Sequence, residues 1–579
     1  MTHPKAANTS TKLLFLQWFV HLAVIVLLAG EAVPGINESH YLPKAKSALD
    51  ATFAPGDLFL ESNNSHFAST YLAGAFTTFL PLTAVAWLGR ILAWGLLSYA
   101  WLRFKSAARI PPLLSPFALA SWYLATEYGH WAGEWAVGGF EGKSLAYPCV
   151  LCALACMLQC RFSGAWLWLG WAVLWHPLVG GWAGITVALV WVCVSWRNPW
   201  TALLTQLPYL LTAALISAVG ILPALGGIGG SEQFGNIVAS QVHVYFRLSH
   251  HLCPLAFDTE RHWAAAITVG SFLLVNVMWF LFRSSSQSSE PSQAKSKQDS
   301  GYEIGEDPKR SVLGRLLLVA WFAVGIAGIG LFVDMQMSVP ESSFYNPLVA
   351  SKILRFYWFR WADIVVPLAS TAMLWHMLGV WGDDVARNGK SQPSWVGRLT
   401  LSMAMVVVLG IGVRRIWNGW DDTLPPADRM LVENMGQRRK VEWPEEDSNR
   451  HRDWMAVCDW IRKETPNDAL WLTPRYQQSF KWYANRAEVV CWKDVPQDNA
   501  SVLEWFTRIQ ILEPKRDARG RIRFWTDKEL AELRNEFGFD YVLADRTYIA
   551  PGEIPMQEIV YPIAPIENRT FAVFRMREP

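Results

Sequence analysis

The sequence predicts an α-helical polytopic membrane protein of about 11 transmembrane helices, followed by a C-terminal soluble α/β domain. Apolar residues make up 52% of the chain and charged residues only 17%, whereas about a quarter of an average soluble domain is charged. More than half of the charged residues, 24 Lys/Arg and 28 Asp/Glu, fall within 418–579. The chain therefore divides into a membrane domain at 1–417 and a soluble domain at 418–579, here called the tail.

Eleven apolar segments are candidates to cross a hydrocarbon core of about 30 Å. The segment at 162–176 is the shortest. Placing the N-terminus in the cytoplasm puts Arg161, Arg197, Arg283 and Arg387 on the cytoplasmic side, as the positive-inside rule requires. The sequence thus predicts a multi-pass protein of the cell inner membrane with an extracytoplasmic tail. The expected spans are 13–30, 81–102, 111–126, 143–160, 162–176, 178–196, 202–225, 263–282, 312–333, 358–380 and 398–417.

Three further segments of the membrane domain have a distinctive composition. Residues 284–311, rich in Ser, Gln and Lys, predict a disordered cytoplasmic linker. Residues 67–79 predict a helix too short to cross the membrane. The second outer loop carries Glu127, His130, Glu134, Glu141 and Lys143 together with Trp131 and Trp135. The spacing of the two tryptophans favours an amphipathic helix lying on the membrane over a catalytic role for this loop.

The tail alternates helical and strand patterns, which is typical of a small α/β layer fold. Thr526 is the expected N-cap of its last helix. The sequence has no glycine-rich nucleotide motif and no basic block that would indicate nucleic acid as a partner. Helices are expected at 454–463, 477–484, 502–511 and 527–537, and strands at 469–473, 488–492, 541–544 and 571–576.

The first outer loop, at 31–66, carries carboxylates where the chain leaves its first span. Glu38 and Asp57 are the two candidate catalytic carboxylates among them. Carboxylates at the edge of a bilayer are costly unless they are solvated, paired or used in chemistry. A solvated acidic loop is the plain alternative to a site.

The motif Asn37-Glu38-Ser39-His40-Tyr41, followed by Ala45 or Ala48 and by Gly56-Asp57, resembles the first outer loop of the GT-C glycosyltransferases. Protein O-mannosyltransferases and the aminoarabinose transferase of lipid A belong to that superfamily. The chain also resembles an uncharacterised bacterial family of multispanning proteins. That second resemblance rests on the Asn-Glu-x-His-Tyr-Leu signature, on Trp175-His176-Pro177 and on the segment Phe356–Asp363.

The GT-C resemblance implies a membrane enzyme that moves a sugar from a polyprenyl-phosphate donor to an extracytoplasmic acceptor. It implies that Glu38 and Asp57 are catalytic, with Asn37, His40 and Tyr41 shaping the substrate site. One position departs from the pattern: the first acid of the usual pair is Asn37 here, and an amide cannot take the proton of an acceptor. Glu38 or Asp57 would then have to act as the base.

Cations in later outer loops fit the departing phosphate of such a reaction. Arg355 and Arg360 are expected to grip the lipid phosphate, with Asp363 orienting Arg360. The alternative is that these arginines pair with lipid headgroups. Arg247 and His251, with His243 and His250 beside them, are further candidates for substrate binding. One histidine can join a carboxylate at a divalent metal, and the alternative is a polar rim. The metal ligands stay unknown.

Two other functions stay open. A transporter or flippase of a lipid-linked or polar solute would suit two helix bundles joined by a linker, although the sequence shows no inverted repeat. A catalytically inactive scaffold of the GT-C fold would explain Asn37. In each case the expected partners are the lipid bilayer and, for the enzyme, a polyprenyl-phosphate-linked sugar and an acceptor of unknown identity.

Overall fold

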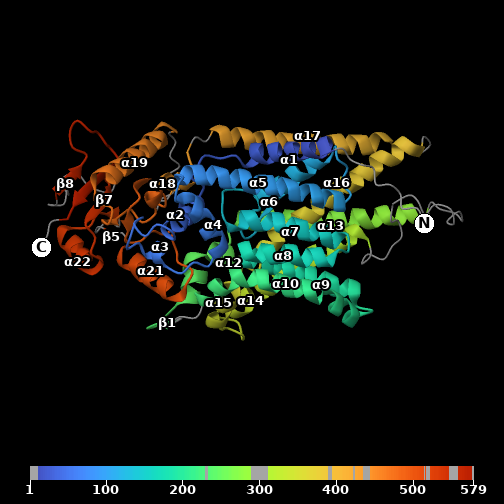
Figure 1. The fold of residues 1–579 in the computed structure, drawn as a ribbon, viewed down its shortest axis with the longest axis horizontal. Helices are drawn as coiled ribbons and strands as arrows, with labels where there is room; N and C mark the ends of the chain where they lie inside the picture. The colour runs from blue at the N-terminus through green and yellow to red at the C-terminus, as the bar shows by residue number, and fades with distance from the viewer. Residues whose placement is uncertain are drawn as a thin grey trace.

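The computed structural model describes residues 11–227, 233–288, 311–388, 394–421, 424–433, 444–513, 515–516, 522–546 and 558–576. The helices of the membrane domain run side by side along the long axis of the molecule (Figure 1). The tail covers one end of this bundle, and the N-terminus lies at the other end. The end covered by the tail is called the tail end.

Each of the eleven expected spans coincides with a helix. Seven of these helices, α1, α5, α9, α10, α13, α14 and α16, are long and apolar enough to cross a membrane. The chain is therefore a multi-pass membrane protein. The apolar helices α7 and α8 have only 17 and 14 residues, so the number of complete crossings is not fixed by length. The bounds are α1 (Thr11–Ala29), α5 (Leu82–Ala107), α6 (Ser115–Gly129), α7 (Gly142–Leu158), α8 (Phe162–Trp175), α9 (Pro177–Ser195), α10 (Pro199–Gly226), α13 (Thr259–Ser288), α14 (Val312–Met337), α16 (Arg360–Asn388) and α17 (Ser394–Asp421).

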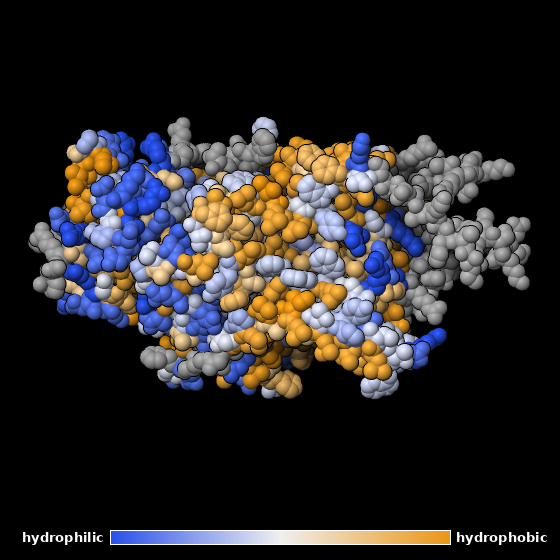
Figure 2. Space-filling view, in the orientation of Figure 1, coloured by the Kyte–Doolittle hydropathy of each residue, from blue (hydrophilic) through white to orange (hydrophobic). Residues whose placement is uncertain are grey.

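Burial separates central helices from peripheral ones. The apolar stretch of α16 is 89% buried within the molecule, whereas those of α10 and α13 are 6% and 11% buried. Figure 2 shows the resulting apolar surface over the bundle and a hydrophilic surface over the tail. An apolar surface of this kind is stable against lipid chains and not against water.

The first outer loop is partly helical. It contains α2 (Glu38–Ser47) and α3 (Leu58–Glu61), and it leads into α4 (Phe67–Thr77), the expected short helix. Two later connections at the tail end are also ordered. One holds β1 (Gln233–Phe234), β2 (Ile237–Val238), α11 (Ala239–Gln241), the π-helix η1 (Val242–Arg247), α12 (Ser249–Leu252) and η2 (Pro254–Ala256), and the other holds α15 (Pro347–Leu354).

Two expectations for the membrane domain need correction. Residues 130–141 form no helix, so the amphipathic surface helix predicted around Trp131 and Trp135 is wrong. Both oxygens of the Asp363 carboxylate accept backbone N–H groups of this loop and hold it in an irregular path. The predicted linker begins too early, because 284–288 form the last turn of α13. Residues 289–310 lie outside the described part of the chain.

The tail has the expected α/β organisation. Its five-stranded sheet has the order β4-β3-β7-β9-β8, in which β3 pairs in parallel with β4 and β7, and β9 pairs antiparallel with β7 and β8. Thr526 caps α22 in a reciprocal capping box with Glu529, as predicted. Helix α17 ends at Asp421, so the tail begins slightly later than residue 418. The tail elements are α18 (Pro426–Glu433), α19 (Pro444–Glu464), β3 (Leu470–Leu472), α20 (Phe480–Ala484), β4 (Ala487–Glu488), α21 (Asn499–Ile511), β5 (Lys515–Arg516), β6 (Ile522–Arg523), α22 (Asp527–Phe537), β7 (Tyr541–Asp545), β8 (Glu558–Tyr561) and β9 (Phe571–Arg575).

The tail packs against the outer loops. Helix α20 contacts α2, and α21 contacts α3, α11 and η1. The connections that precede and follow the spans at this end are thereby gathered in one place, and the candidate functional residues lie among them.

Candidate active site at the tail end of the bundle

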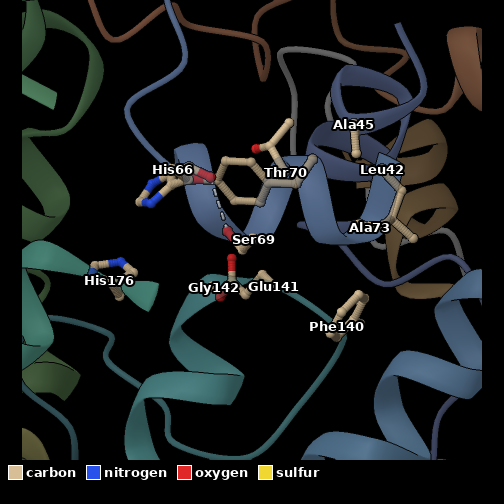
Figure 3. Close-up of a pocket in the computed structure, with 11 residues that line it drawn as sticks. Leu42, Ala45, His66, Ser69, Thr70, Ala73, Phe140, Glu141, Gly142 and His176 are labelled. Carbon is tan, nitrogen blue, oxygen red and sulfur yellow. Dashed lines mark hydrogen bonds between the residues drawn. The ribbon is translucent and has the colours of Figure 1, made fainter. Parts of the chain in front are cut away.

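A small cavity opens between the first and second outer loops (Figure 3). Its wall combines an apolar side from α2 and α4 with imidazole, hydroxyl and carboxylate groups. The lining residues are Tyr41, Leu42, Ala45, His66, Ser69, Thr70, Ala73, Phe140, Glu141, Gly142 and His176.

Glu141 is the carboxylate in this wall. It caps the N-terminus of α7, where it forms a reciprocal capping box with Ser144. Its side-chain Oε2 accepts a hydrogen bond of 3.0 Å from Asn37 Nδ2. The other oxygen, Oε1, has no hydrogen-bond donor among the described residues and lies 3.3 Å from Lys143 Nζ. A carboxylate in a cavity wall can accept a proton from a bound hydroxyl group.

Glu141 belongs to a cluster of ion pairs in which carboxylates and cations alternate. Lys143 Nζ lies 3.3 Å from both Glu141 and Glu134, and Arg360 Nε lies 3.1 Å from Glu134 Oε2. Lys143 also stands 3.7 Å above the ring of Trp135. These two cations and two carboxylates balance each other, which is the condition for burying charge at tolerable cost.

Asn37 connects this cluster to the tail. Its amide Nδ2 donates to Glu141, and its Oδ1 accepts a hydrogen bond of 2.9 Å from Lys493 Nζ. An amide offers a donor and an acceptor at once, whereas a carboxylate only accepts. Asn37 therefore fits between a carboxylate and an ammonium group, and an aspartate would not.

Glu38 is held differently. Its two oxygens accept hydrogen bonds from the backbone N–H groups of Gly35 (2.7 Å) and Phe140 (2.8 Å), and from Arg90 Nε and Nη2 at 2.7 and 2.6 Å. The residue is 1% exposed and is not among those that line the cavity. Its geometry is that of a structural anchor between the first and second outer loops.

Asp57 is likewise enclosed. It caps α3 through Leu60 N, and its Oδ2 accepts from Glu488 N at 3.2 Å and lies 3.1 Å from Lys481 Nζ. Its side chain is 1% exposed and also lies outside the cavity lining. Asp57 thus joins α3 to the tail.

Lys481 is the centre of this buried network. Besides Asp57, its ammonium group lies 2.7 Å from Glu488 Oε1 and 2.6 Å from Asp494 Oδ2. Burial raises the pKa of Glu488 to about 7, with Asp494 and Asp57 adding to the rise and Lys481 opposing it. Burial works in the same direction on Asp494, but Lys481 and His40 outweigh it and hold its pKa at about 2. Three carboxylates around one lysine are thus tolerated because one of them takes up a proton easily.

His40 belongs to this network and not to the cavity wall. Its Nδ1 lies 2.6 Å from Asp494 Oδ1, and its ring stacks on Phe59 with the centroids 4.0 Å apart. Burial lowers the pKa of His40 to about 4, although the hydrogen bond to Asp494 works against this. A neutral imidazole therefore donates its Nδ1–H to the carboxylate. Tyr41, next in sequence, does line the cavity and is 3.5 Å from Gln497 of the tail.

Two histidines face each other in the cavity wall. The rings of His66 and His176 are 4.9 Å apart. Nδ1 of His176 accepts the N–H of Val179 as the N-cap of α9, so the neutral ring carries its proton on Nε2. Burial lowers the pKa of His66 to about 4, helped by the charges of Lys143 and Lys44. Both rings are thus neutral polar groups next to Glu141.

The remaining expected substrate-binding residues surround this region. Arg247 Nε donates to Trp492 O at 2.9 Å, and His251 Nδ1 lies 2.6 Å from Ala132 O. Arg355 ends α15, and Arg360 starts α16 and stacks on Tyr357 at 3.8 Å. The expected orientation of Arg360 by Asp363 is wrong, because Asp363 accepts three backbone N–H groups of the second outer loop while Arg360 pairs with Glu134.

A divalent metal does not fit the acidic groups gathered here. Within the described ranges, one trio of candidate ligands lies close enough together: Glu488, Cys491 and Asp494, all buried, with ligand atoms within 4.8 Å. Lys481 already occupies the space between the two carboxylates as their counter-charge. Burial raises the pKa of the Cys491 thiol well above its usual value, which disfavours the thiolate that a metal needs.

Similarity to known proteins is limited. Residues 452–512 match a domain of unknown function, DUF6798. This segment contains Lys481, Glu488, Lys493, Asp494 and Gln497, which contact the first outer loop. No curated protein sequence is significantly similar to the chain.

Solved structures with a similar arrangement are membrane glycosyltransferases of the GT-C kind. ArnT from Cupriavidus metallidurans bound to undecaprenyl phosphate matches over 98% of both chains, with 14% identity and a TM-score of 0.42. The archaeal oligosaccharyltransferase AglB from Archaeoglobus fulgidus, in complex with an inhibitory peptide and a dolichol-phosphate, matches over 92% of this chain and 69% of its own, with 11% identity and a TM-score of 0.41. The Archaeoglobus fulgidus oligosaccharyltransferase tethered to an acceptor peptide matches over 93% of this chain and 69% of its own, with 11% identity and a TM-score of 0.43. At these values the likeness says nothing of activity.

Sequence reasoning noted Glu134, Glu141 and Lys143 but assigned them to a surface helix. A signal for a site was present: Glu141 directly precedes a span on the same side of the membrane as Asn37. The tail residues Lys481 and Lys493 were missed altogether. The signal at Lys481 is a lone charge between apolar residues, Phe480-Lys481-Trp482-Tyr483, which indicates a buried and paired cation.

Proposed function

We propose that this chain is a membrane glycosyltransferase that moves a sugar from a polyprenyl-phosphate donor to an extracytoplasmic acceptor. The observation that carries the proposal is Glu141. It is a buried carboxylate in a cavity wall, held by a hydrogen bond from Asn37 and by Lys143, whose Nζ lies 3.3 Å from Oε1. The proposed topology is that of an inner-membrane protein whose N-terminus is cytoplasmic and whose tail is extracytoplasmic.

In this reaction the acceptor hydroxyl attacks the anomeric carbon, the bond from that carbon to the phosphate oxygen breaks, and the lipid phosphate leaves. The base takes the hydroxyl proton. We assign this role to Glu141 in place of Glu38 and Asp57, because Glu141 lines the cavity and the other two carboxylates do not. The imidazoles of His66 and His176 would hold sugar hydroxyl groups, with Tyr41 forming the wall beside them.

The negative charge on the leaving phosphate requires cations. Arg355 and Arg360 are the proposed partners, as the sequence indicated, with Arg360 kept in place by Glu134 and by the ring of Tyr357. Lys143 lies beside the base and balances its charge. Asn37 keeps the base in position and does not act as one.

A transfer assay in proteoliposomes tests the function. Radiolabelled polyprenyl-phosphate sugars are offered to the wild type, to Glu141→Gln and to Glu61→Gln, a control at an exposed carboxylate of the first outer loop that accepts the backbone N–H of Gly56. We expect label to move to an acceptor with the wild type and with Glu61→Gln. With Glu141→Gln the rate of transfer should fall by about 10²- to 10⁴-fold. Label that crosses the bilayer without transfer would contradict the proposal and favour a flippase.

A further inference from the structure

Arg247, in η1, is a buried cation without a buried counter-charge. The residue is 8% exposed, and its Nε is fixed by Trp492 O at 2.9 Å while the guanidinium lies 5.3 Å above the Trp492 ring. Across the described ranges no carboxylate pairs with it, and its two terminal nitrogens have no acceptor. Asp494, a carboxylate that acts on it electrostatically, is already bound to Lys481 at 2.6 Å.

Lys493, which is partly buried, is a second cation, and the chain places it next to Arg247. The backbone carbonyl that holds Arg247 belongs to the residue directly before Lys493. Lys493 Nζ donates to the neutral amide of Asn37, and no ion pair links it to a carboxylate in the described part of the chain. Burial lowers the pKa of Lys493 to about 8, and the charge of Arg247 is the next largest cause.

The histidines around this pair respond to the same excess of positive charge. The pKa of His250 is lowered to about 4, mainly by burial and then by the charges of Arg247, Arg261 and Lys493. The pKa of His243 is lowered to about 3, mainly by burial and then by the charges of Arg355 and Arg247. By contrast, Lys143 and Arg360 are balanced by Glu134 and Glu141. The excess of positive charge therefore lies around Arg247 and Lys493, with Arg261 and Arg355 adding to it.

We propose that Arg247 and Lys493 form an oxyanion-binding site that takes a phosphate group at the junction between η1 and the tail. Holding a buried and a partly buried cation side by side without an anion is costly, and a phosphate would offset both charges. The fork of a guanidinium matches two phosphate oxygens, and an ammonium group adds a point charge. The site spans both domains, so phosphate binding requires the tail to be docked. The proposal concerns binding and does not depend on sugar transfer.

The bound phosphate can come from two sources: a polyprenyl phosphate or an acceptor that carries a phosphate group. Equilibrium dialysis of the full chain in phosphatidylcholine nanodiscs distinguishes them, with labelled inorganic phosphate and a labelled polyprenyl monophosphate as probes. Polyprenyl phosphate that displaces inorganic phosphate from the site would assign it to the lipid. Inorganic phosphate that stays bound at saturating polyprenyl phosphate would assign it to the acceptor.

Three variants test the residues. Arg247→Gln and Lys493→Gln should each weaken phosphate binding by about tenfold or more, because each removes a charge-assisted interaction. Arg475→Gln is the matched control: this arginine also approaches the Trp492 ring, but Glu513 neutralises it at 2.7 Å, so its binding should equal that of the wild type. If Arg247→Gln does not fold, Lys493→Gln alone decides, since its side chain is only partly buried. Absence of saturable binding to the wild type, or unchanged binding in Lys493→Gln, would overturn the proposal.

Discussion

Asn37 Nδ2 donates a hydrogen bond of 3.0 Å to Glu141 Oε2, across 104 residues of sequence. This contact explains why the first outer loop carries an amide where the GT-C pattern has an acid. In the proposed reaction the carboxylate would be supplied from the second outer loop by Glu141, and a second acid at position 37 would repel it. The departure at Asn37 is thus compatible with an active enzyme.

Asn37→Asp should impair transfer. The introduced carboxylate would face Glu141 at about 3 Å, and two carboxylates at such a distance share one proton. The base would then be free only at higher pH, so we expect the rate at neutral pH to fall at least about tenfold and the acidic limb of the pH–rate profile to move upward. A gain of activity at neutral pH would contradict this assignment and support a scaffold that had lost its acid.

His176→Asn separates two roles of one side chain. Asparagine can still cap α9, but it cannot place a ring N–H in the cavity beside His66. We expect thermal stability close to that of the wild type and a rise in KM for the donor of about 2- to 10-fold, the usual value of one neutral hydrogen bond. His176→Ala, which loses the cap as well, should also lower stability. An unchanged KM for His176→Asn would remove the imidazole from the sugar site.

Lys481→Met should loosen the tail from the first outer loop. It leaves Asp57, Glu488 and Asp494 as buried carboxylates without their cation. Removing one partner of a buried ion pair costs about 3–5 kcal/mol, so the melting temperature should drop and limited proteolysis should release the tail. Adding Glu488→Gln to Lys481→Met should restore part of the stability, because one of the unpaired charges is removed. A double variant no more stable than Lys481→Met would contradict the network.

His40 should make the stability of the protein depend on pH. Its pKa is about 4 in the folded state, against 6.5 for the ordinary side chain. Between these values the unfolded chain binds more protons, so stability falls as pH decreases from about 6.5 to about 4, by about 3 kcal/mol in total. The raised pKa of Glu488 increases stability as pH falls from about 7 to about 4.5. This effect is present in both wild type and His40→Gln, so it cancels when the two proteins are compared. The difference in melting temperature should therefore change across this window, and a constant difference would contradict the buried neutral state of His40.

The fold could largely be predicted from the sequence because its signals are local. Each apolar segment long enough to be expected as a span forms a helix. The capping box of Thr526 and Glu529 fixes the start of α22. The second outer loop was misjudged because its conformation is set from a distance. Asp363 binds the backbone of 131–134 from another helix, and no local periodicity records such a contact.

The site was harder to predict for the same reason. Glu38 and Glu141 are both acids near the ends of spans, and the sequence alone cannot show which one is saturated by Arg90 and which one faces a cavity. The partners supplied by the tail, Lys481 and Lys493, lie more than 400 positions from the first outer loop. Their role follows from the docking of two domains and not from any spacing within one motif.

The central claim is that Glu141, and not Glu38, is the base. The most direct test measures single-turnover transfer from a polyprenyl-phosphate sugar, together with the melting temperature, in Glu141→Gln and Glu38→Gln. We predict that Glu141→Gln keeps its melting temperature near that of the wild type and loses about 10²-fold or more in rate. Glu38→Gln should melt at a clearly lower temperature, because Arg90 loses its buried counter-charge, and yet transfer sugar at a measurable rate per folded molecule. A stable Glu38→Gln without transfer beside an active Glu141→Gln would contradict the account.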